Sequence, residues 1–277
     1  MALITTGRAD FLEILGLVSH AALLPDRHDG HSRGAMIVLL TDFGLEGPYT
    51  GQVIAVLQRD SPGVPSISLF ADAPAAQPKP AAYLFAAYAA WFAAGTVLLC
   101  VVDPGVGGTR HPLIVEADGR LYVGPDNGLF EPVLRRARTA QVWEIAWTPP
   151  ALSASFHGRD LFAPVAARLA RGEPPSSLGR AAAATRFPDW PDDLAEIVYT
   201  DRYGNALTGL RGAALAPGAR LAAAGQIVMP APVFSAVPRG AAFWYVNSNG
   251  LAEIAVNGGR ADRALGLRIG TAVTVLG

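Results

Sequence analysis

Residues 96–110 read TVLLCVVDPGVGGTR and join an apolar run to a charged turn. The run ends at Asp103, which places this carboxylate at the carboxyl end of a predicted strand, where open α/β sheets bind ligands. The proline and three glycines that follow allow a tight turn, which returns Arg110 toward Asp103. A second stretch, SASFHGRD at 153–160, puts His157 just before a predicted helix, whose first amide groups lack intrahelical partners. We therefore predict that Asp103, Arg110 and His157 surround one small polar site.

Predicted strands and helices alternate through the first half of the chain. The first three strands are predicted at 36–42, 64–70 and 96–103, and the helices between them at 47–60 and 81–92. This order favours an α/β fold with a doubly wound, mostly parallel sheet. Further elements are predicted as strands at 112–117, 120–124 and 141–146 and a helix at 159–171.

The composition changes after residue 172. Residues 173–193 are rich in Pro and Ser and indicate a linker, and the later apolar runs are short and separated by Gly and Pro. Such runs are typical of a β-barrel or sandwich. We expect an α/β domain at 36–172 with the catalytic residues and a smaller C-terminal β-barrel domain at 194–277 that completes the substrate site. Residues 1–35 are expected to be a mobile N-terminal extension, because charged residues interrupt their apolar patch and no cleavage site follows it.

Charge and composition exclude several classes of function. A formal net charge of -1 without a basic stripe argues against a nucleic-acid partner. The sequence has no run of 18 apolar residues, which argues against a membrane span. Its one cysteine, Cys100, lies in a predicted strand, so the fold is not a disulfide scaffold and suits a reducing compartment. We therefore expect a cytoplasmic protein that acts on a small molecule.

Further polar residues follow predicted strands or lie in glycine-containing turns. Each taken alone is typical of a turn, but several at one edge of a sheet indicate a binding pocket. They are Asp42, Asp126, Asn127, Asp201, Asn205, Ser248, Asn249 and Glu253. No HxxxH or CxxC spacing is present, so we predict neither a metal site nor a cofactor.

Five motifs in order resemble one known family. They are TDFG at 41–44, VDPGVG at 102–107 followed by Arg110, GPDNG at 124–128, FHGRD at 156–160 and NSNGLAEIAVN at 247–257. As a set they resemble the adenosine-forming S-adenosyl-L-methionine hydrolases, also called SAM hydroxide adenosyltransferases, which are relatives of the fluorinases and chlorinases. The resemblance extends from Met36 to the C-terminus.

The resemblance implies a fold, an assembly and a set of roles. Members have an α/β N-terminal domain and a β-barrel C-terminal domain, form homotrimers, and bind substrate between the two domain types of neighbouring subunits. The catalytic set falls on Asp103, Arg110 and His157, which would direct water or hydroxide to C5′ of the substrate. The remaining predicted substrate contacts are Asp42 at the ribose, Asp201 at the methionine amine, Asn205, Ser248 and Asn257 at the adenine or methionine end, with Asp126, Asn127, Phe156, Tyr203 and Glu253 nearby.

Two other functions stay open at this point: a 5′-halogenase, and a non-catalytic protein that binds S-adenosylmethionine or adenosine. Halogenases resembling this chain carry other residues, notably tyrosines, where Asp103 and His157 stand, which favours water as the nucleophile. The chain departs from its relatives at Ala75 and Ala76, where an aromatic wall is common, and at Asn249, which replaces an arginine of halogenases. Whether His157 removes a proton from water depends on its pKa.

Overall fold

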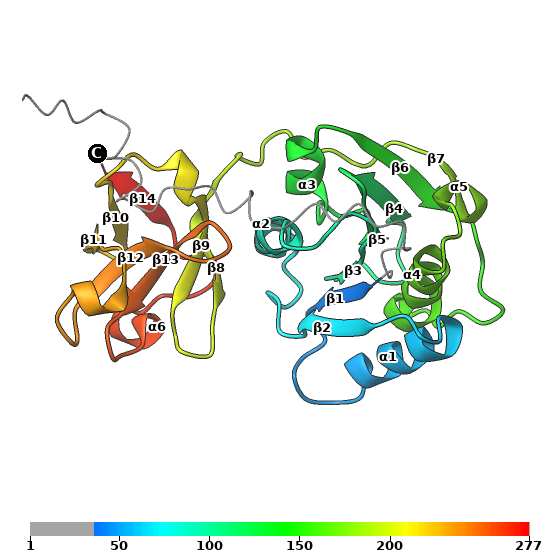
Figure 1. Cartoon of the computed structure of the whole chain (residues 1–277), viewed down its shortest axis with the longest axis horizontal. Helices are drawn as coiled ribbons and strands as arrows, with labels where there is room; N and C mark the ends of the chain where they lie inside the picture. The colour runs from blue at the N-terminus through cyan, green and yellow to red at the C-terminus, as the bar shows by residue number, and fades with distance from the viewer. Residues whose placement is uncertain (1–35, 277) are drawn as a thin grey trace, which may run out of the picture. The chain divides into compact units, whose positions relative to one another are not determined.

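The computed structural model describes residues 36–276, which form two seven-stranded sheets (Figure 1). The strands of the first sheet are β1 (Ile37–Thr41), β2 (Ser66–Phe70), β3 (Val97–Val101), β4 (Pro112–Ala117), β5 (Arg120–Pro125), β6 (Ala140–Ile145) and β7 (Gly179–Ala181). The helices of this half are α1 (Tyr49–Asp60), α2 (Pro78–Ala89), α3 (Glu131–Arg136), the π-helix η2 (Gly158–Phe162), α4 (Ala163–Ala170) and α5 (Pro175–Leu178).

Helices cover both faces of this first sheet, as a doubly wound fold requires (Figure 1). Along β1, Ile37 and Leu39 pack in one apolar cluster with α1 and α4, whereas Val38 and Leu40 pack in another with α2. Because both faces are buried, the strand is apolar throughout. Cys100 of β3 lies on the α2 side and is buried, which raises the pKa of its thiol. The predicted doubly wound α/β architecture is thus confirmed.

Only half of the sheet is parallel. The strand order is β2-β1-β3-β5-β4-β6-β7, and β2, β1, β3 and β5 pair in parallel, while β4, β6 and β7 are added antiparallel. The expected mostly parallel sheet ends at β5 for a local reason. Asp118 and Gly119 connect β4 to β5 with φ angles of 47° and 78°, and two such residues favour the turn of a tight antiparallel hairpin.

The predicted helix at 159–171 has two parts. Its first turns form the π-helix η2, in which the amide of Ala163 donates to the carbonyl of Gly158, and α4 follows. Pro164 has no amide hydrogen and cannot continue a regular α-helical ladder from the residues before it. The irregular turn therefore begins directly after His157.

The segment predicted to be a linker contains regular structure. Within 173–193, the short helix α5 is followed by β7, which pairs with β6 and extends the first sheet. Leu178 anchors this stretch because its side chain is buried. Composition alone predicted a linker because Leu178 is the one large apolar side chain within residues 175–181, which gives little sign of a strand.

The second sheet forms a nearly closed barrel, which confirms the predicted β-barrel domain. Its strand order is β14-β10-β11-β12-β13-β9-β8, and a bridge between Glu196 and Ala272 connects β8 to the chain just before β14. Ile197, Leu221 and Ile254 fill its interior. Its elements are β8 (Leu194–Thr200), β9 (Ala206–Arg211), η3 (Gly212–Ala214), β10 (Arg220–Ala223), β11 (Gln226–Pro230), η4 (Phe234–Ala236), β12 (Ala242–Val246), β13 (Leu251–Val256), α6 (Ala261–Ala264) and β14 (Val273–Leu276).

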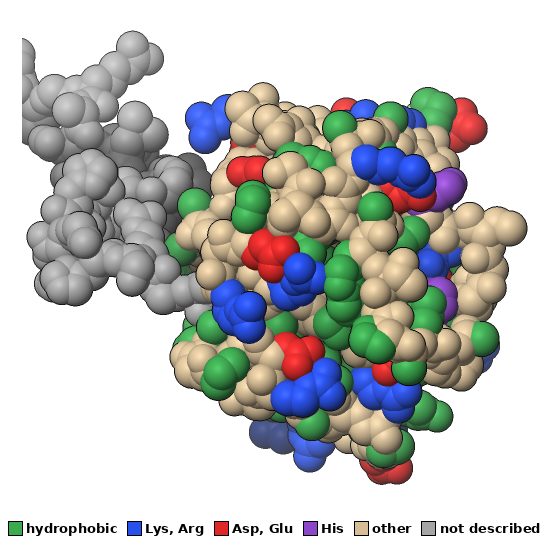
Figure 2. Space-filling view, turned by 90° about the vertical axis from the view of Figure 1, so that its right-hand side faces the viewer, with side chains coloured by type: hydrophobic (Ala, Val, Ile, Leu, Met, Phe, Trp, Pro, Cys, Tyr) green, Lys and Arg blue, Asp and Glu red, His purple; other side chains and the backbone are tan. Residues whose placement is uncertain are grey.

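The surface of the α/β half carries charges of both signs. Figure 2 shows Lys and Arg interspersed with Asp and Glu on this face, with no large area of one sign. Ion pairs such as Arg168–Glu173 and Arg59–Asp60 account for part of this mixture. No helix within residues 36–276 is long and apolar enough to cross a membrane. The predicted mobile extension, residues 1–35, lies outside the described residues.

Glu131 connects α3 to the chain between the two sheets. Its carboxylate is 2% exposed and accepts hydrogen bonds from Arg135 and Arg186, at 2.9 and 2.8 Å, and from the amide of Phe187. Burial alone would raise its pKa, but the two arginines and the amide outweigh burial and hold the pKa of Glu131 below its ordinary value.

We expect Glu131→Gln to lower the free energy of unfolding at neutral pH by roughly 1–3 kcal/mol, because charge-assisted hydrogen bonds are lost. A lowered carboxyl pKa stabilises the fold above the ordinary value of 4.5, and this contribution is lost as the pH falls through the folded-state pKa. Urea unfolding should therefore show the two proteins converging at acidic pH. Glu46→Gln, at an exposed position, is the control, and equal stability of Glu131→Gln and wild type at neutral pH would contradict the assignment.

Candidate active site

Two neighbouring parallel strands end in aspartates. Thr41 of β1 pairs with Val101 of β3, so Asp42 and Asp103 emerge together at the carboxyl edge of the sheet. After Asp103 the chain turns tightly, because the amide of Val106 donates to the Asp103 carbonyl. This turn places the next charged residue, Arg110, back over the end of β3.

The three residues that the sequence predicted to lie together are joined by the Arg110 guanidinium, which bonds to both Asp103 and His157. Its Nε donates to Asp103 Oδ2 at 3.0 Å, and its Nη2 donates to Asp103 Oδ2 and also to His157 Nδ1, the latter at 2.8 Å. The side chains of Arg110 and Asp103 are only 10% and 4% exposed. A charge pair so shielded from water is held in one geometry more firmly than a surface pair.

His157 is neutral in this arrangement. A guanidinium has only donors, so Nδ1 of His157 accepts the hydrogen bond from Arg110 and the ring proton lies on Nε2. Burial, and then the positive charge of Arg110, lower the pKa of His157, while Asp103 and Asp160 oppose this effect. Near neutral pH the ring therefore offers an N–H donor rather than a base.

Asp103 and His157, but not Arg110, line a cavity of about 530 Å³, within the size range of small-molecule sites. Asp42, Asp103 and His157 form part of its wall. Phe156, which was predicted as a substrate contact, packs edge-on against Phe43 and Tyr49 and forms an aromatic wall with them. The cavity thus combines an apolar surface with a few charged groups.

Asp42 is held by the loop that follows β2. The amide of Ala76 donates to Asp42 Oδ2 at 2.8 Å, and Ala76 has a φ angle of 55°, which is uncommon for a residue with a side chain. Burial raises the pKa of Asp42, and the nearby Asp103 acts in the same direction. Ala76 lies in the cavity wall and presents only a methyl group there.

A second cavity, of about 770 Å³, is lined by residues of the barrel half and by Tyr88 of α2. It contains five of the predicted substrate contacts: Asp201, Tyr203, Asn205, Ser248 and Glu253. Asp201 accepts hydrogen bonds from the backbone amide and the side chain of Asn205, at 2.8 and 3.0 Å. Tyr245 and Asn247 donate to the carboxylate of Glu253, whose burial raises its pKa. The cavity is acidic and suits a cationic group.

Within residues 36–276, the two cavities share no lining residue. Most of the predicted site residues therefore fall into two groups, one in each cavity. Arg110 lines neither cavity but bonds to Asp103 and His157 of the first group. Three predicted contacts line neither cavity. Asp126 accepts hydrogen bonds from Thr185, Asn127 donates to the carbonyl of Val102, and Asn257 donates to the carbonyl of Val237.

Several lining residues were not singled out from the sequence. Phe43, Tyr49 and Gln52 line the first cavity, and Tyr88, Tyr245 and Asn247 the second. Phe43 and Asn247 lie inside the motifs TDFG and NSNG, which is the one signal that pointed to them. Tyr49 and Tyr88 belong to helices whose apolar spacing is equally typical of core residues.

The described residues contain no group of three or more His, Cys, Asp or Glu side chains placed to hold a metal ion. The first cavity is lined by one histidine, two aspartates, one arginine (Arg159) and aromatic rings, and Arg110 bonds to the histidine and to one of the aspartates.

We expect His157 to titrate below its ordinary pKa of 6.5, with the proton on Nε2 in the neutral ring. Replacing Arg110 with alanine removes a positive neighbour and leaves Asp103, so the pKa of His157 should rise. Histidine ring NMR signals followed against pH test both statements, with His157→Gln to assign the signal. A titration at or above 6.5 in the wild type, or a fall in Arg110→Ala, would refute this picture.

Comparisons with known proteins identify the family of this chain. The model of the SAM hydroxide adenosyltransferase N-terminal domain matches residues 37–179, and that of the C-terminal domain matches residues 195–274. A protein of Thermus thermophilus named (R)-S-adenosyl-L-methionine hydrolase is 40% identical over 87% of this chain and 99% of its own length. One of the same name from Salinispora tropica is 35% identical over 86% of this chain and 97% of its own.

Two solved structures share the fold of this chain. An uncharacterized conserved protein from Thermotoga maritima has a TM-score of 0.79 and 28% identity, covering 87% of this chain and all of its own. A conserved hypothetical protein from Thermus thermophilus has a TM-score of 0.69 and 36% identity over the same shares. Since the N-terminal domain model alone matches more than half of the sequence, this chain belongs to the SAM hydroxide adenosyltransferase family.

Proposed function

We propose that this chain hydrolyses (R)-S-adenosyl-L-methionine to adenosine and L-methionine, the activity that its curated relatives are named for. The observation that carries the proposal is the Arg110 guanidinium, bonded to both Asp103 and His157 beside the first cavity. This arrangement offers positive charge and a neutral N–H donor next to carboxylates, which suits an oxygen nucleophile held near a cationic substrate.

The reaction balances without a further reactant. A water oxygen bonds to C5′, the C5′–S bond breaks, and its electron pair returns to sulfur, which leaves as a neutral thioether. Water gives up one proton, so a sulfonium cation and water yield adenosine, methionine and a proton. Because the leaving group needs no neutralisation, we propose that the enzyme requires no metal and no cofactor.

The three central residues act on the nucleophile. Arg110 and the Nε2–H of His157 stabilise developing hydroxide, while Asp103 fixes Arg110 and helps to align the oxygen with the C5′–S bond. His157 is a poor general base here. Freeing Nε2 would require a proton on Nδ1, which would then face the donors of Arg110.

The remaining contacts divide between the domains that we propose at 36–172 and 194–277. Asp42 and Phe156 line the first cavity and would hold the ribose and an apolar face of the substrate. Asp201, with Asn205, Ser248, Tyr203 and Glu253 around it, would bind the methionine ammonium group in the second cavity. Their carboxylates suit a cationic substrate.

We propose a homotrimer in which the first cavity of one subunit meets the second cavity of its neighbour. Support comes from the separation of the two groups of contacts within one chain. Large apolar side chains are also exposed at both cavities: Tyr49 is 51% exposed and Tyr203 is 76% exposed. Such an assembly would bring both ends of the substrate site together.

We also propose that the enzyme works in the cytoplasm on its small-molecule substrate alone, without nucleic acid. A single buried cysteine is compatible with a reducing compartment, and a net charge of -1 offers no general attraction for phosphate backbones.

Turnover in ¹⁸O-water should place one label in the 5′-hydroxyl of adenosine and none in methionine, since the nucleophile attacks C5′ opposite sulfur. The rate should be unchanged by EDTA, and chloride should yield no 5′-chloro product. Mass spectrometry of both products measures the position of the label and detects any 5′-chloro product, with an Asp103→Ala protein as the control for background breakdown.

Three results would count against the proposed chemistry: label in methionine, methylthioadenosine as the main enzyme-dependent product, or activity lost on chelation and restored by a divalent ion. Each result would show that Asp103, Arg110 and His157 do not direct a water nucleophile to C5′ as proposed.

The shared site predicts complementation between two impaired subunits, measured at substrate concentrations well below the raised KM. Asp103→Ala should lower kcat by ~100-fold or more, and Asp201→Ala should mainly raise KM. A randomly refolded equal mixture should regain about a quarter of the wild-type sites, because one site in four combines the intact half of each variant. Mixing Asp103→Ala with His157→Ala, both in the same half, is the matched control. A fully active monomer by light scattering would refute the shared site.

A further inference from the structure

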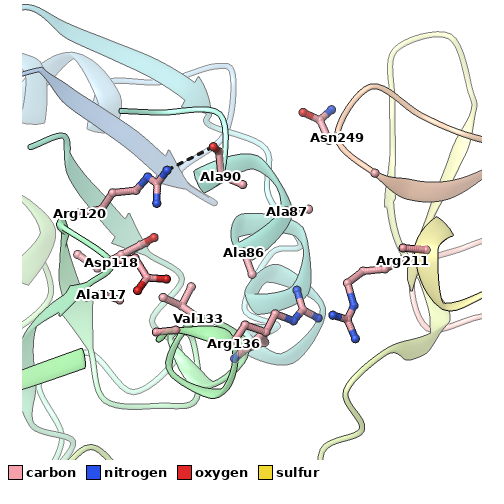
Figure 3. Close-up of a pocket in the computed structure, with 15 residues that line it drawn as sticks. Ala86, Ala87, Ala90, Ala117, Asp118, Arg120, Val133, Arg136, Arg211 and Asn249 are labelled. Carbon is pink, nitrogen blue, oxygen red and sulfur yellow. Dashed lines mark hydrogen bonds between the residues drawn. The ribbon is translucent and has the colours of Figure 1, made fainter. Parts of the chain in front are cut away.

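A third cavity, of about 390 Å³, lies apart from the proposed chemistry and carries an excess of positive charge (Figure 3). Ala86, Ala87 and Ala90 of α2 form an apolar wall, and Val133 of α3 continues it. The charged side chains that line the cavity are Arg120, Arg136, Arg211 and Asp118, which sum to a formal charge of +2, or +1 when Asp193, the ion-pair partner of Arg211, is included.

Arg136 is the least compensated of these cations. Its side chain is half-buried, and its one hydrogen bond within the described part of the chain goes to the carbonyl of Asp192 at 2.8 Å. No ion pair to Arg136 is found among residues 36–276. Burial, and then the neighbouring charge of Arg211, lower the pKa of Arg136, while the nearby carboxylates of Asp193 and Asp192 oppose this effect. A desolvated cation next to a like charge is costly unless an anion joins it.

Arg211 faces Arg136 from the barrel half (Figure 3). Its Nε and Nη2 bond to the carboxylate of Asp193, which leaves Nη1 without a hydrogen-bond partner in the described chain. Arg120 and Asp118 are engaged elsewhere. Arg120 donates to the carbonyls of Phe92 and Ala90, and Asp118 accepts from the amides that follow α3. Arg120 keeps only Nη1 without a partner in the described chain, whereas Arg136 keeps Nε and Nη1. The guanidinium groups of Arg136 and Arg211 face each other (Figure 3).

We propose that this cavity binds a small organic anion, with a carboxylate or phosphate group between Arg136 and Arg211 and an apolar body against the alanines of α2. Guanidinium groups match the planar or tetrahedral oxygens of these anions with paired N–H donors. The volume is sufficient for a compact ligand of this kind. The site is separate from the reaction and does not depend on the proposed hydrolysis.

An occupant of this cavity would also touch the loop that carries Ser248. Asn249 lines both this cavity and the acidic cavity of the barrel half, and the indole N–H of Trp91, just after α2, donates to the Ser248 carbonyl at 3.3 Å. The anion site thus lies directly behind a predicted substrate-binding loop.

Isothermal titration of the full-length protein at low salt tests the proposal with three probes: phenyl phosphate, benzoate and inorganic phosphate. We expect one site per chain, at least about tenfold weaker binding in Arg136→Gln, and no change in Arg138→Gln, which removes an exposed arginine just beyond α3. The two aromatic probes distinguish a phosphate from a carboxylate group. Phenyl phosphate should bind more tightly than inorganic phosphate, because the ring packs on α2.

Ala87→Leu provides a test that keeps both arginines in place. Because the larger side chain occupies space beside the apolar wall, the variant should bind phenyl phosphate more weakly, while its affinity for inorganic phosphate should not change. The proposal is overturned if the wild type binds none of the probes at millimolar concentration, or if Arg136→Gln binds them as well as the wild type. Equal binding of phenyl phosphate and inorganic phosphate would overturn the apolar half of the proposal.

Discussion

The guanidinium of Arg110 is the constraint on which the proposed site depends. It fixes Asp103 and His157 at once, and it reaches both because the chain turns sharply after β3. This turn requires a glycine at position 107, because a Cβ atom on Gly107 would lie 2.4 Å from the carbonyl oxygen of Ala154. The segment before His157 can therefore approach the turn only along a bare backbone. A sheet edge, a glycine and one arginine together set the tautomer of the histidine.

Buried carboxylates give both cavities a common electrostatic character. Asp42 in one and Glu253 in the other have pKa values raised by burial, so each is more easily protonated than an exposed carboxylate. A cationic ligand near either group would favour its ionised form. Binding of such a ligand would then be linked to proton release, and its affinity would rise with pH over the range in which these groups titrate.

Much of the fold was predictable because burial leaves a simple pattern. Strands β1, β3 and β4 are apolar runs with clear ends, and the aspartates after β1 and β3 pointed to one edge of the sheet. The features that were missed depend on local geometry or on distant contacts. The Asp118–Gly119 turn makes β4 antiparallel to β5. A π-helical turn precedes Pro164 and the start of α4, and β7 is a strand because it pairs with β6. Asp126 and Asn127 belong to the GPDNG motif, but their side chains form hydrogen bonds with the backbone of Thr185 and Val102 and line neither of the two site cavities.

The burial of Cys100 has a practical consequence. The chain has one cysteine, it lies at the centre of the first sheet, and its raised thiol pKa leaves almost no thiolate in the folded state. The folded protein should therefore react very slowly with thiol reagents. A cysteine placed on the surface would accept a dye or spin label alone, without removing the native residue. Conversely, slow labelling of Cys100 itself would report how often the strands around it separate.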